Sequence, residues 1–243
     1  MSDITVAERT DLWAVEKARI RRTYADRETK LAGGDSYSLA NPAYLFTIQQ
    51  RQRAILSALQ REGLWPLAGK RILELGCGTG GVLLELLAFG GTPALLHGTD
   101  LLAERVTLAR ARLPHLPLNC AHGGRLPYPD RSFDLVLQFT VFSSILDQPV
   151  CYTVSQEIVR VLKPDGLILW YDFWINPFNK QTRGVRPHEI RDYFPGSRLN
   201  FERITLAPPL ARRLVPKTWV GALLLEKLRL FNTHYLATIR PGG

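Results

Sequence analysis

The sequence has few cysteines and no long apolar run, and these two features exclude several classes of protein. Its three cysteines, Cys77, Cys120 and Cys151, have neither the pairing of a disulfide framework nor the spacing of a zinc site. We therefore expect a reducing compartment and no metal. No stretch approaches the roughly 18 apolar residues of a transmembrane helix, and the first residues lack the basic start and apolar run of a signal peptide. The sequence predicts a cytoplasmic protein.

Acidic residues become scarce toward the end of the chain. Residues 1–177 carry 19 basic and 18 acidic side chains, whereas residues 178–243 carry 12 and 4, so most of the net charge of +9 lies in this last part. Such a region attracts nucleic acid, anionic lipid or an acidic small molecule, or it is a solvated face with no partner. Because its basic residues are not interleaved with aromatic ones as in RNA-binding modules, nucleic acid is the least favoured partner.

Apolar strands that alternate with longer helices predict the fold class. A chain of 243 residues, 46% hydrophobic, is long enough for one core and one domain. The alternation is typical of an α/β fold with a doubly wound, mostly parallel sheet covered on both faces. We expect strands at 71–75, 94–99, 116–120, 133–139, 166–173, 199–206 and 235–239, and helices at 5–24, 42–60, 80–89, 101–112, 150–161, 188–193 and 219–231.

A glycine-rich turn follows the first of these strands. Gly76, Gly78 and Gly81 have the spacing of dinucleotide-binding proteins, while Gly76, Gly78 and Gly80 have the tighter spacing of methyltransferases, so the glycines alone leave both readings open. Asp100 lies 20 residues after Gly80, at the end of the second strand, where a carboxylate can accept hydrogen bonds from both ribose hydroxyls. A turn that only reverses the chain, and an aspartate that only caps a helix, are the plain structural alternatives.

Four segments between residues 71 and 173 resemble class I S-adenosylmethionine-dependent methyltransferases of the broad type 11 group. The last two are the more specific, because NAD-dependent dehydrogenases do not share them in this order. The segments are Leu73-Glu74-Leu75-Gly76-Cys77-Gly78-Thr79-Gly80, Gly98-Thr99-Asp100-Leu101, Leu126-Pro127-Tyr128-Pro129-Asp130-Arg131-Ser132-Phe133-Asp134, and Val161-Leu162-Lys163-Pro164-Asp165-Gly166.

The resemblance implies a seven-stranded Rossmann-like sheet and S-adenosylmethionine as cofactor, with S-adenosylhomocysteine as product. It places the backbone around Gly76, Cys77 and Gly78 against the methionine part, and Glu74 near the ammonium group, directly or through water. It also implies that Asp100 holds the ribose. These are the expected roles of the first strand, its turn and the end of the second strand.

Further roles follow from the same resemblance. Leu101 would pack on the adenine, and Gln138 and Phe139 would lie near the sulfonium. Where the family often has an adenine-binding aspartate, this chain has His122, so adenine recognition would rest on backbone groups near Gly123 and Gly124.

The resemblance also divides the chain, which we expect to be one methyltransferase domain over 1–243. Residues 1–62 would form an N-terminal helical lid, 63–173 the cofactor-binding core, and 174–243 the acceptor-side elements and last strands. Tyr37 and Tyr44 flank the loop that would close over the cofactor. Packing within the lid is an equally good account of these two rings.

Methyl transfer is an in-line displacement that relies on alignment and exclusion of water, so it requires no fixed catalytic motif. If the acceptor is a hydroxyl, a general base helps; Asp172, at the end of the fifth strand, and His188 are the candidates. The basic segment 176–186 favours an acidic or phosphorylated small-molecule acceptor. The aliphatic helix at 219–231 favours ordinary core packing over an apolar acceptor or transient contact with an anionic membrane.

Two rival functions stay open on these residues. One is a NAD(P)-dependent oxidoreductase, which the alternative glycine spacing allows. The other is a catalytically idle cofactor-binding module that works as a partner protein. The pattern also leaves open whether oxygen, nitrogen or carbon is methylated.

Overall fold

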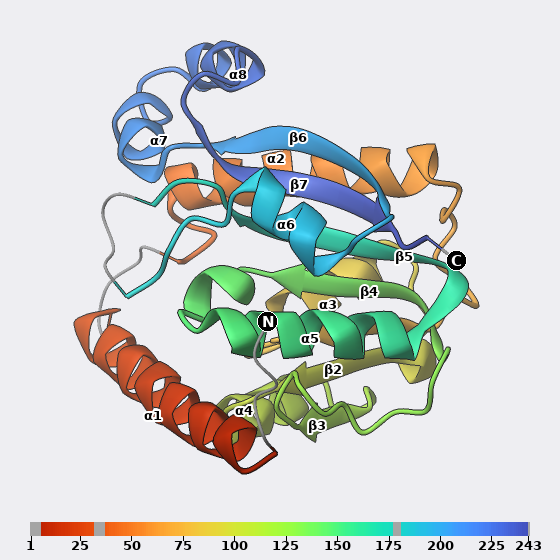
Figure 1. The fold of residues 1–243 in the computed structure, drawn as a ribbon. Helices are drawn as coiled ribbons and strands as arrows, with labels where there is room; N and C mark the ends of the chain where they lie inside the picture. Colours follow the sequence, from red (N-terminus) through yellow and green to blue (C-terminus); the bar gives the residue numbers. More distant parts are fainter. Residues whose placement is uncertain (1–5, 32–36, 177–180, 243) are drawn as a thin grey trace.

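One seven-stranded sheet organises the molecule. The computed structural model describes residues 6–31, 37–176 and 181–242 (Figure 1). The strands follow the order β3-β2-β1-β4-β5-β7-β6. Their bounds are β1 Ile72–Leu75, β2 Leu96–Asp100, β3 Leu118–Cys120, β4 Phe133–Phe139, β5 Leu162–Phe173, β6 Arg198–Leu206 and β7 Asn232–Arg240.

The first five strands are parallel, and β7 runs antiparallel between β5 and β6. In register, Leu75 lies opposite Thr99 of β2 and Gln138 of β4, so these three strands end together. Strand order reverses at β1, where the chain turns from β3-β2 to β4-β5. Ligands of open α/β sheets bind at such a switch point. The predicted doubly wound, mostly parallel sheet is confirmed.

Helices cover both faces of this sheet (Figure 1). The helix predicted over 42–60 begins at a cap, because the side chain of Asn41 accepts hydrogen bonds from the backbone N–H groups of Ala43 and Tyr44. The bounds are α1 Val6–Leu31, α2 Pro42–Arg61, α3 Gly81–Ala88, α4 Ala103–Arg112, α5 Gln148–Val161, α6 Pro187–Tyr193, α7 Pro208–Leu214 and α8 Trp219–Lys227, with short 3-10 turns at η1 Pro93–Leu95 and η2 Phe142–Ser144.

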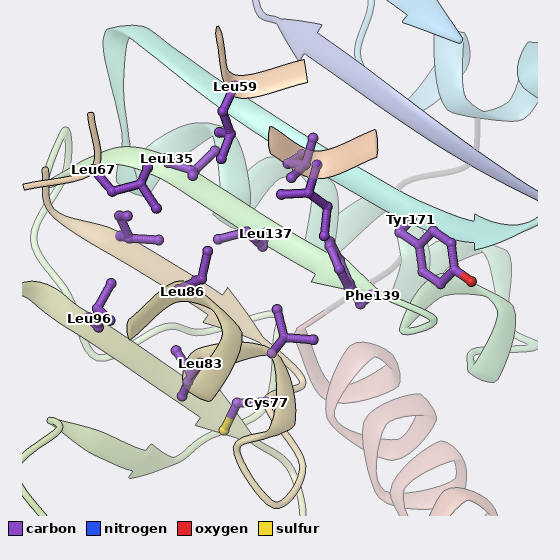
Figure 2. Close-up of a cluster of buried hydrophobic side chains, with 14 of the residues drawn as sticks. Leu59, Leu67, Cys77, Leu83, Leu86, Leu96, Leu135, Leu137, Phe139 and Tyr171 are labelled. Atoms are coloured by element: carbon purple, nitrogen blue, oxygen red, sulfur yellow. The ribbon is translucent and has the colours of Figure 1, made fainter. Parts of the chain in front are cut away.

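Alternate residues of the central strands build two separate cores. Leu135 and Leu137 of β4 point toward α2, α3 and α4, where they meet residues such as Leu59 and Leu83 (Figure 2). Val136, between them, points toward α1, α5 and α6 on the opposite face. Because successive side chains of a strand alternate in direction, this continuous apolar strand is buried on both sides.

The tail differs from the prediction in two places. Helix α7 was not predicted, although its two prolines stand in the first turn, where the missing N–H groups cost nothing. The helix expected over 219–231 ends at Lys227, and Arg229 has a left-handed backbone with φ of 59°. That conformation ends a right-handed helix and lets β7 begin at Asn232.

The elements that the sequence predicted in the tail otherwise form. Within the described residues, no helix combines the length and apolarity that crossing a bilayer requires.

Candidate active site

A cavity of about 370 Å³ lies where β1, β2 and β4 end. Its floor is the turn between β1 and α3, and helices α1 and α2 contribute side chains to its walls. The lining residues are Trp13, Ile20, Tyr24, Tyr44, Arg51, Glu74, Leu75, Gly76, Cys77, Gly78, Thr79, Gly81, Val82, Glu85, Asp100, Leu101, Leu102, Arg105, Ala121, Gly123, Phe139, Thr140, Val141, Ser144, Ile145 and Val154.

The turn that forms the floor requires glycine at two positions. Gly76 and Gly78 have φ of 71° and 54°, a region that side chains disfavour. A Cβ at Gly76 would lie 2.5 Å from Cγ2 of Val141, and one at Gly78 would lie 2.7 Å from Nη2 of Arg105. The floor of the cavity is therefore bare backbone, which a ligand can approach closely.

Asp100 holds the turn against the end of β2. Its Oδ2 accepts a hydrogen bond from the backbone N–H of Gly78 at 2.8 Å, and its Oδ1 accepts one from Leu102 at 2.9 Å. The carboxylate is only half-buried and faces the cavity. It can therefore accept further hydrogen bonds from a ligand, since a carboxylate has about four acceptor positions.

Glu74 brings a carboxyl group with an unpartnered oxygen to the same place. The residue is buried, and its Oε2 has no hydrogen-bond partner within the part of the chain that is described. Burial raises the pKa of Glu74 to about 8; Arg51 opposes this rise, while Glu85 and Asp100 add to it. A buried carboxylate without a partner is costly, and a cationic ligand such as an ammonium group would satisfy it. The site therefore fits the amino-acid end of the cofactor that the sequence predicts.

An ion pair across the cavity was not predicted. Arg51 of α2 pairs with Glu85 of α3, and both side chains are largely buried. The Arg51 guanidinium lies 5.6 Å from the centre of the Phe139 ring. One oxygen of Glu85 and Nε of Arg51 have no partner among the described residues. These two atoms can therefore form hydrogen bonds with a ligand at the wall between α2 and α3.

Helix α1 closes one side of the cavity with Trp13, Ile20 and Tyr24. It is attached to the loop after η2 through Glu16, whose Oε1 accepts a hydrogen bond from the backbone N–H of Leu146 at 2.8 Å. Arg19 pairs with Glu16 and donates to the carbonyl of Ser144. The sequence predicted a helix over 5–24 but not the elements against which it packs.

Most of the predicted cofactor residues line this one cavity. Glu74, the turn and Asp100 come together as the argument from the strand ends requires. The predicted residues that line it are Tyr44, Glu74, Gly76, Cys77, Gly78, Asp100, Leu101, Gly123 and Phe139.

Three other predicted residues lie outside the lining. Tyr37 is 68% exposed and makes an edge contact with Tyr44, with ring centres 5.6 Å apart. Gly124 lies against the ring of Trp13. Gln138 is fully buried, and its Oε1 accepts a hydrogen bond from the backbone N–H of Val141 at 3.2 Å. Gln138 therefore supports a lining residue and does not line the cavity itself.

Neither candidate base lines the cavity. Asp172 is 1% exposed, and its two oxygens accept hydrogen bonds from the backbone N–H groups of Ser143 at 3.0 Å and Phe173 at 2.8 Å. Burial raises the pKa of Asp172 to about 6, against these hydrogen bonds. His188 is exposed on α6. The predicted acceptor segment 176–186 includes residues 177–180, which lie outside the described residues.

Comparison with known proteins gives a family match over the core of the fold. A family model described as a methyltransferase domain matches residues 72–166. A fatty-acid O-methyltransferase of Mycolicibacterium smegmatis is 40% identical over 43% of this chain and 37% of its own length. A phthiotriol/phenolphthiotriol dimycocerosates methyltransferase of Mycobacterium ulcerans is 35% identical over 47% of this chain and 41% of its own length.

The similarity extends to a tRNA N(3)-cytidine methyltransferase of Gallus gallus, 31% identical over 44% of this chain and 31% of its own length. The chain thus spans less than half the length of these curated relatives. Among solved structures, an S-adenosylmethionine-dependent methyltransferase from Clostridium acetobutylicum has a TM-score of 0.57 at 15% identity, covering 80% of this chain and 92% of its own. This last likeness concerns the fold alone.

The matched segment contains β1, the glycine turn, Asp100 and the end of β4, which together form the floor of the cavity. The seven-stranded sheet belongs to a fold that is similar to the solved structure at a TM-score of 0.57. Residues 72–166 therefore form a methyltransferase domain, and the chain has the fold of a solved S-adenosylmethionine-dependent methyltransferase.

Proposed function

We propose that this protein transfers a methyl group from S-adenosylmethionine to a small, lipid-like acceptor by in-line displacement. The observation that carries the proposal is the unpartnered Oε2 of Glu74 beside the bare backbone of Gly76 and Gly78. An ammonium group satisfies the buried carboxylate, and only a backbone without side chains lets an amino-acid moiety approach it. S-adenosylmethionine supplies a methyl group already activated by a positively charged sulfur.

The residues that we propose to bind the cofactor form three groups along the cavity, one for each part of the molecule. Glu74 and the glycine turn would hold the methionine end, and Asp100 would accept hydrogen bonds from the ribose. Leu101 and Gly123 line the part that would take the adenine. With the cofactor held at three points, the protein orients the reacting carbon and excludes water from it, and these two effects are the main contributions a methyltransferase makes.

One part of the cavity wall is apolar and favours an apolar acceptor. Ile20 and Trp13 of α1 face the same space as Val141, Ile145 and Val154. Burial of a hydrocarbon chain against such residues contributes about 25 cal/mol per Å². The curated relatives named for fatty acids and for phthiotriol lipids support this acceptor class.

A carboxylate is the acceptor group that the site favours. Asp172 and His188 do not line the cavity, and a carboxylate already carries the electron pair that forms the new bond, so no base is needed. Arg51 lines the cavity, and its Nε, which has no partner among the described residues, can donate a hydrogen bond to such an acceptor.

Turnover with labelled cofactor tests the proposal. The purified chain is incubated with methyl-labelled S-adenosylmethionine and, separately, a long-chain fatty acid, a phenolic lipid or total tRNA. We expect label in the fatty-acid ester. Label in tRNA alone would replace the acceptor class by nucleic acid, as in the Gallus gallus relative.

Calorimetry separates the two rival functions. Binding of S-adenosylhomocysteine without binding of NAD excludes the oxidoreductase. Binding of S-adenosylhomocysteine with no turnover on any acceptor supports the idle module instead. Micromolar or tighter binding, about −8 kcal/mol or more, is the expected range for the product.

A further inference from the structure

We propose that α7, α8 and the turn after α8 form a docking surface for an anionic lipid bilayer. Four aliphatic side chains there, Val220, Leu224, Leu228 and Leu230, are 60 to 69% exposed. The first three are spaced four residues apart, which places them on one face of α8 and its last turn. Phe231 adds a half-exposed ring. Contiguous exposed apolar side chains of this kind mark an interaction surface.

The exposed face is not a consequence of loose packing, because the opposite face of α8 is firmly buried. Ala222 is fully buried and joins a core of its own with Phe46, Ala211 and Val215. Glu226 accepts a hydrogen bond from the backbone N–H of Thr205 at 3.0 Å. The sequence favoured ordinary core packing for this helix, yet the structure places only one of its two apolar faces in the core. The second face is free for a partner.

The segment that carries this apolar face is also basic. Between residues 208 and 231 the chain has five basic residues, all exposed, and one acidic residue, the buried Glu226. Arg229 pairs with Glu202 at 2.7 Å. The remaining basic residues are Arg212, Arg213, Lys217 and Lys227. Each Lys or Arg near an anionic membrane surface contributes about 1 kcal/mol.

This combination favours a bilayer over a second copy of the chain. Two copies joined through the same face would bring their cations together and would be repelled. The nine residues of α8 extend only about 14 Å, so the helix lies in the interface and does not span it. Figure 1 shows α7 and α8 at one end of the molecule, beyond the edge of β6, where a flat surface can reach them.

The surface is also connected to the cavity. The ring of Trp219, at the start of α8, lies 5.3 Å from that of Phe46 in α2, and Tyr44, two residues before Phe46, lines the cavity. Docking would therefore bring the membrane next to the first turns of α2, which contribute Tyr44 to the cavity wall. The proposal extends the proposed function but does not depend on it, because membrane docking is measured without acceptor or cofactor.

Vesicle co-sedimentation of the full chain tests the proposal. The vesicles contain phosphatidylcholine alone or with phosphatidylglycerol. We expect binding only when phosphatidylglycerol is present, and weaker binding at high salt. The double variant Arg212→Gln/Arg213→Gln should weaken binding by roughly tenfold or more. Its matched control is Arg61→Gln/Arg131→Gln, which removes two exposed cations from α2 and the loop before β4.

The apolar face is tested in the same assay by Leu224→Ser/Leu228→Ser. The control is Leu84→Ser/Leu108→Ser, which changes two exposed leucines of α3 and α4. All four variants should keep the wild-type melting temperature, because the altered side chains are exposed. Absence of binding to anionic vesicles overturns the proposal. So does equal weakening by surface and control variants, or a sedimentation-velocity dimer that only Leu224→Ser/Leu228→Ser dissociates.

Discussion

The carboxylate of Asp100 accepts a hydrogen bond from the backbone N–H of Gly78, 22 residues earlier in the chain, at 2.8 Å. This contact joins the end of β2 to the glycine turn that follows β1. The same carboxylate faces the cavity, so it both shapes the floor and presents acceptor atoms to a ligand. Cofactor affinity should consequently be sensitive to this one side chain.

Asp100→Ala should weaken binding of S-adenosylhomocysteine by roughly 1.5 to 3 kcal/mol, the loss expected for hydrogen bonds to a charged group. Calorimetric titration measures the change. Asp165→Ala, which removes an exposed aspartate of β5, serves as the control and should bind normally. An unaltered affinity in Asp100→Ala would remove Asp100 from the binding site.

Cofactor binding should release a proton from Glu74 at neutral pH. Burial raises the pKa of this carboxyl to about 8, so in the free protein it is mostly protonated at pH 7, and pairing with an ammonium requires its ionised form. Affinity should therefore rise with pH up to about 8. Titrations in buffers of different ionisation enthalpy count the protons, and Glu74→Gln should abolish the release. The same proton count in wild type and variant would contradict this role.

The residues that the sequence predicted well are those set by local pattern. Glu74, Gly76 and Asp100 lie at strand ends, and the parallel register of β1 with β2 brings strand ends together without further information. The start of α2 at Pro42 also depends on its immediate neighbours and was predicted at the same residue. For this reason the floor of the cavity could be predicted from one sequence.

The walls of the cavity could not be predicted in the same way. Arg51 pairs with Glu85 across 34 residues, and Glu16 contacts Leu146 across 130. Such contacts depend on how whole helices pack, which periodicity does not specify. The surroundings of Asp172 could not be predicted either: its strand-end position suggested a base, and the structure adds that the backbone N–H of Ser143 donates a hydrogen bond to its carboxylate.

Gly76→Ala should destabilise the fold more than Gly90→Ala. Both glycines have left-handed backbones, with φ of 71° and 86°, and an alanine costs about 1 to 2 kcal/mol in that conformation. Only at Gly76 would the new Cβ also meet a side chain, Cγ2 of Val141 at 2.5 Å, whereas Gly90 has open space. Urea unfolding of the two variants should show the difference. Equal losses of unfolding free energy would mean that the side chain of Val141 moves away from the new Cβ at little cost.

Asp172→Asn should alter the pH dependence of stability. Burial raises the pKa of Asp172 from 3.8 to about 6, so its contribution to stability is present below pH 3.8 and is lost as pH rises through 6. The loss amounts to roughly 3 kcal/mol at most. The difference in unfolding free energy between wild type and variant should thus change between pH 4 and 6 and stay constant above 7.

The same variant tests the role of Asp172 in the reaction. Since the carboxylate does not line the cavity, the pH profile of kcat should keep its shape in Asp172→Asn. A profile that loses its acidic limb, with KM unchanged, would restore Asp172 as the general base.

Glu16→Ala should loosen α1 and weaken cofactor binding several-fold. Glu16 Oε1 accepts a hydrogen bond from the backbone N–H of Leu146 at 2.8 Å, and its loss would leave this donor unpaired at a cost of about 1 to 3 kcal/mol. Because Trp13, Ile20 and Tyr24 line the cavity from the same helix, a detached α1 would open it to water.

Hydrogen exchange over residues 13–26 measures the loosening, and S-adenosylhomocysteine titration measures its effect on binding. The matched control is Glu104→Ala, which breaks another contact with α1, the exposed pair with Arg21. Exposed pairs contribute at most about 1 kcal/mol, so exchange and affinity should stay near wild type in the control. If both variants behave alike, α1 is held by its apolar contacts, and Glu16 is not the residue that keeps the cavity closed.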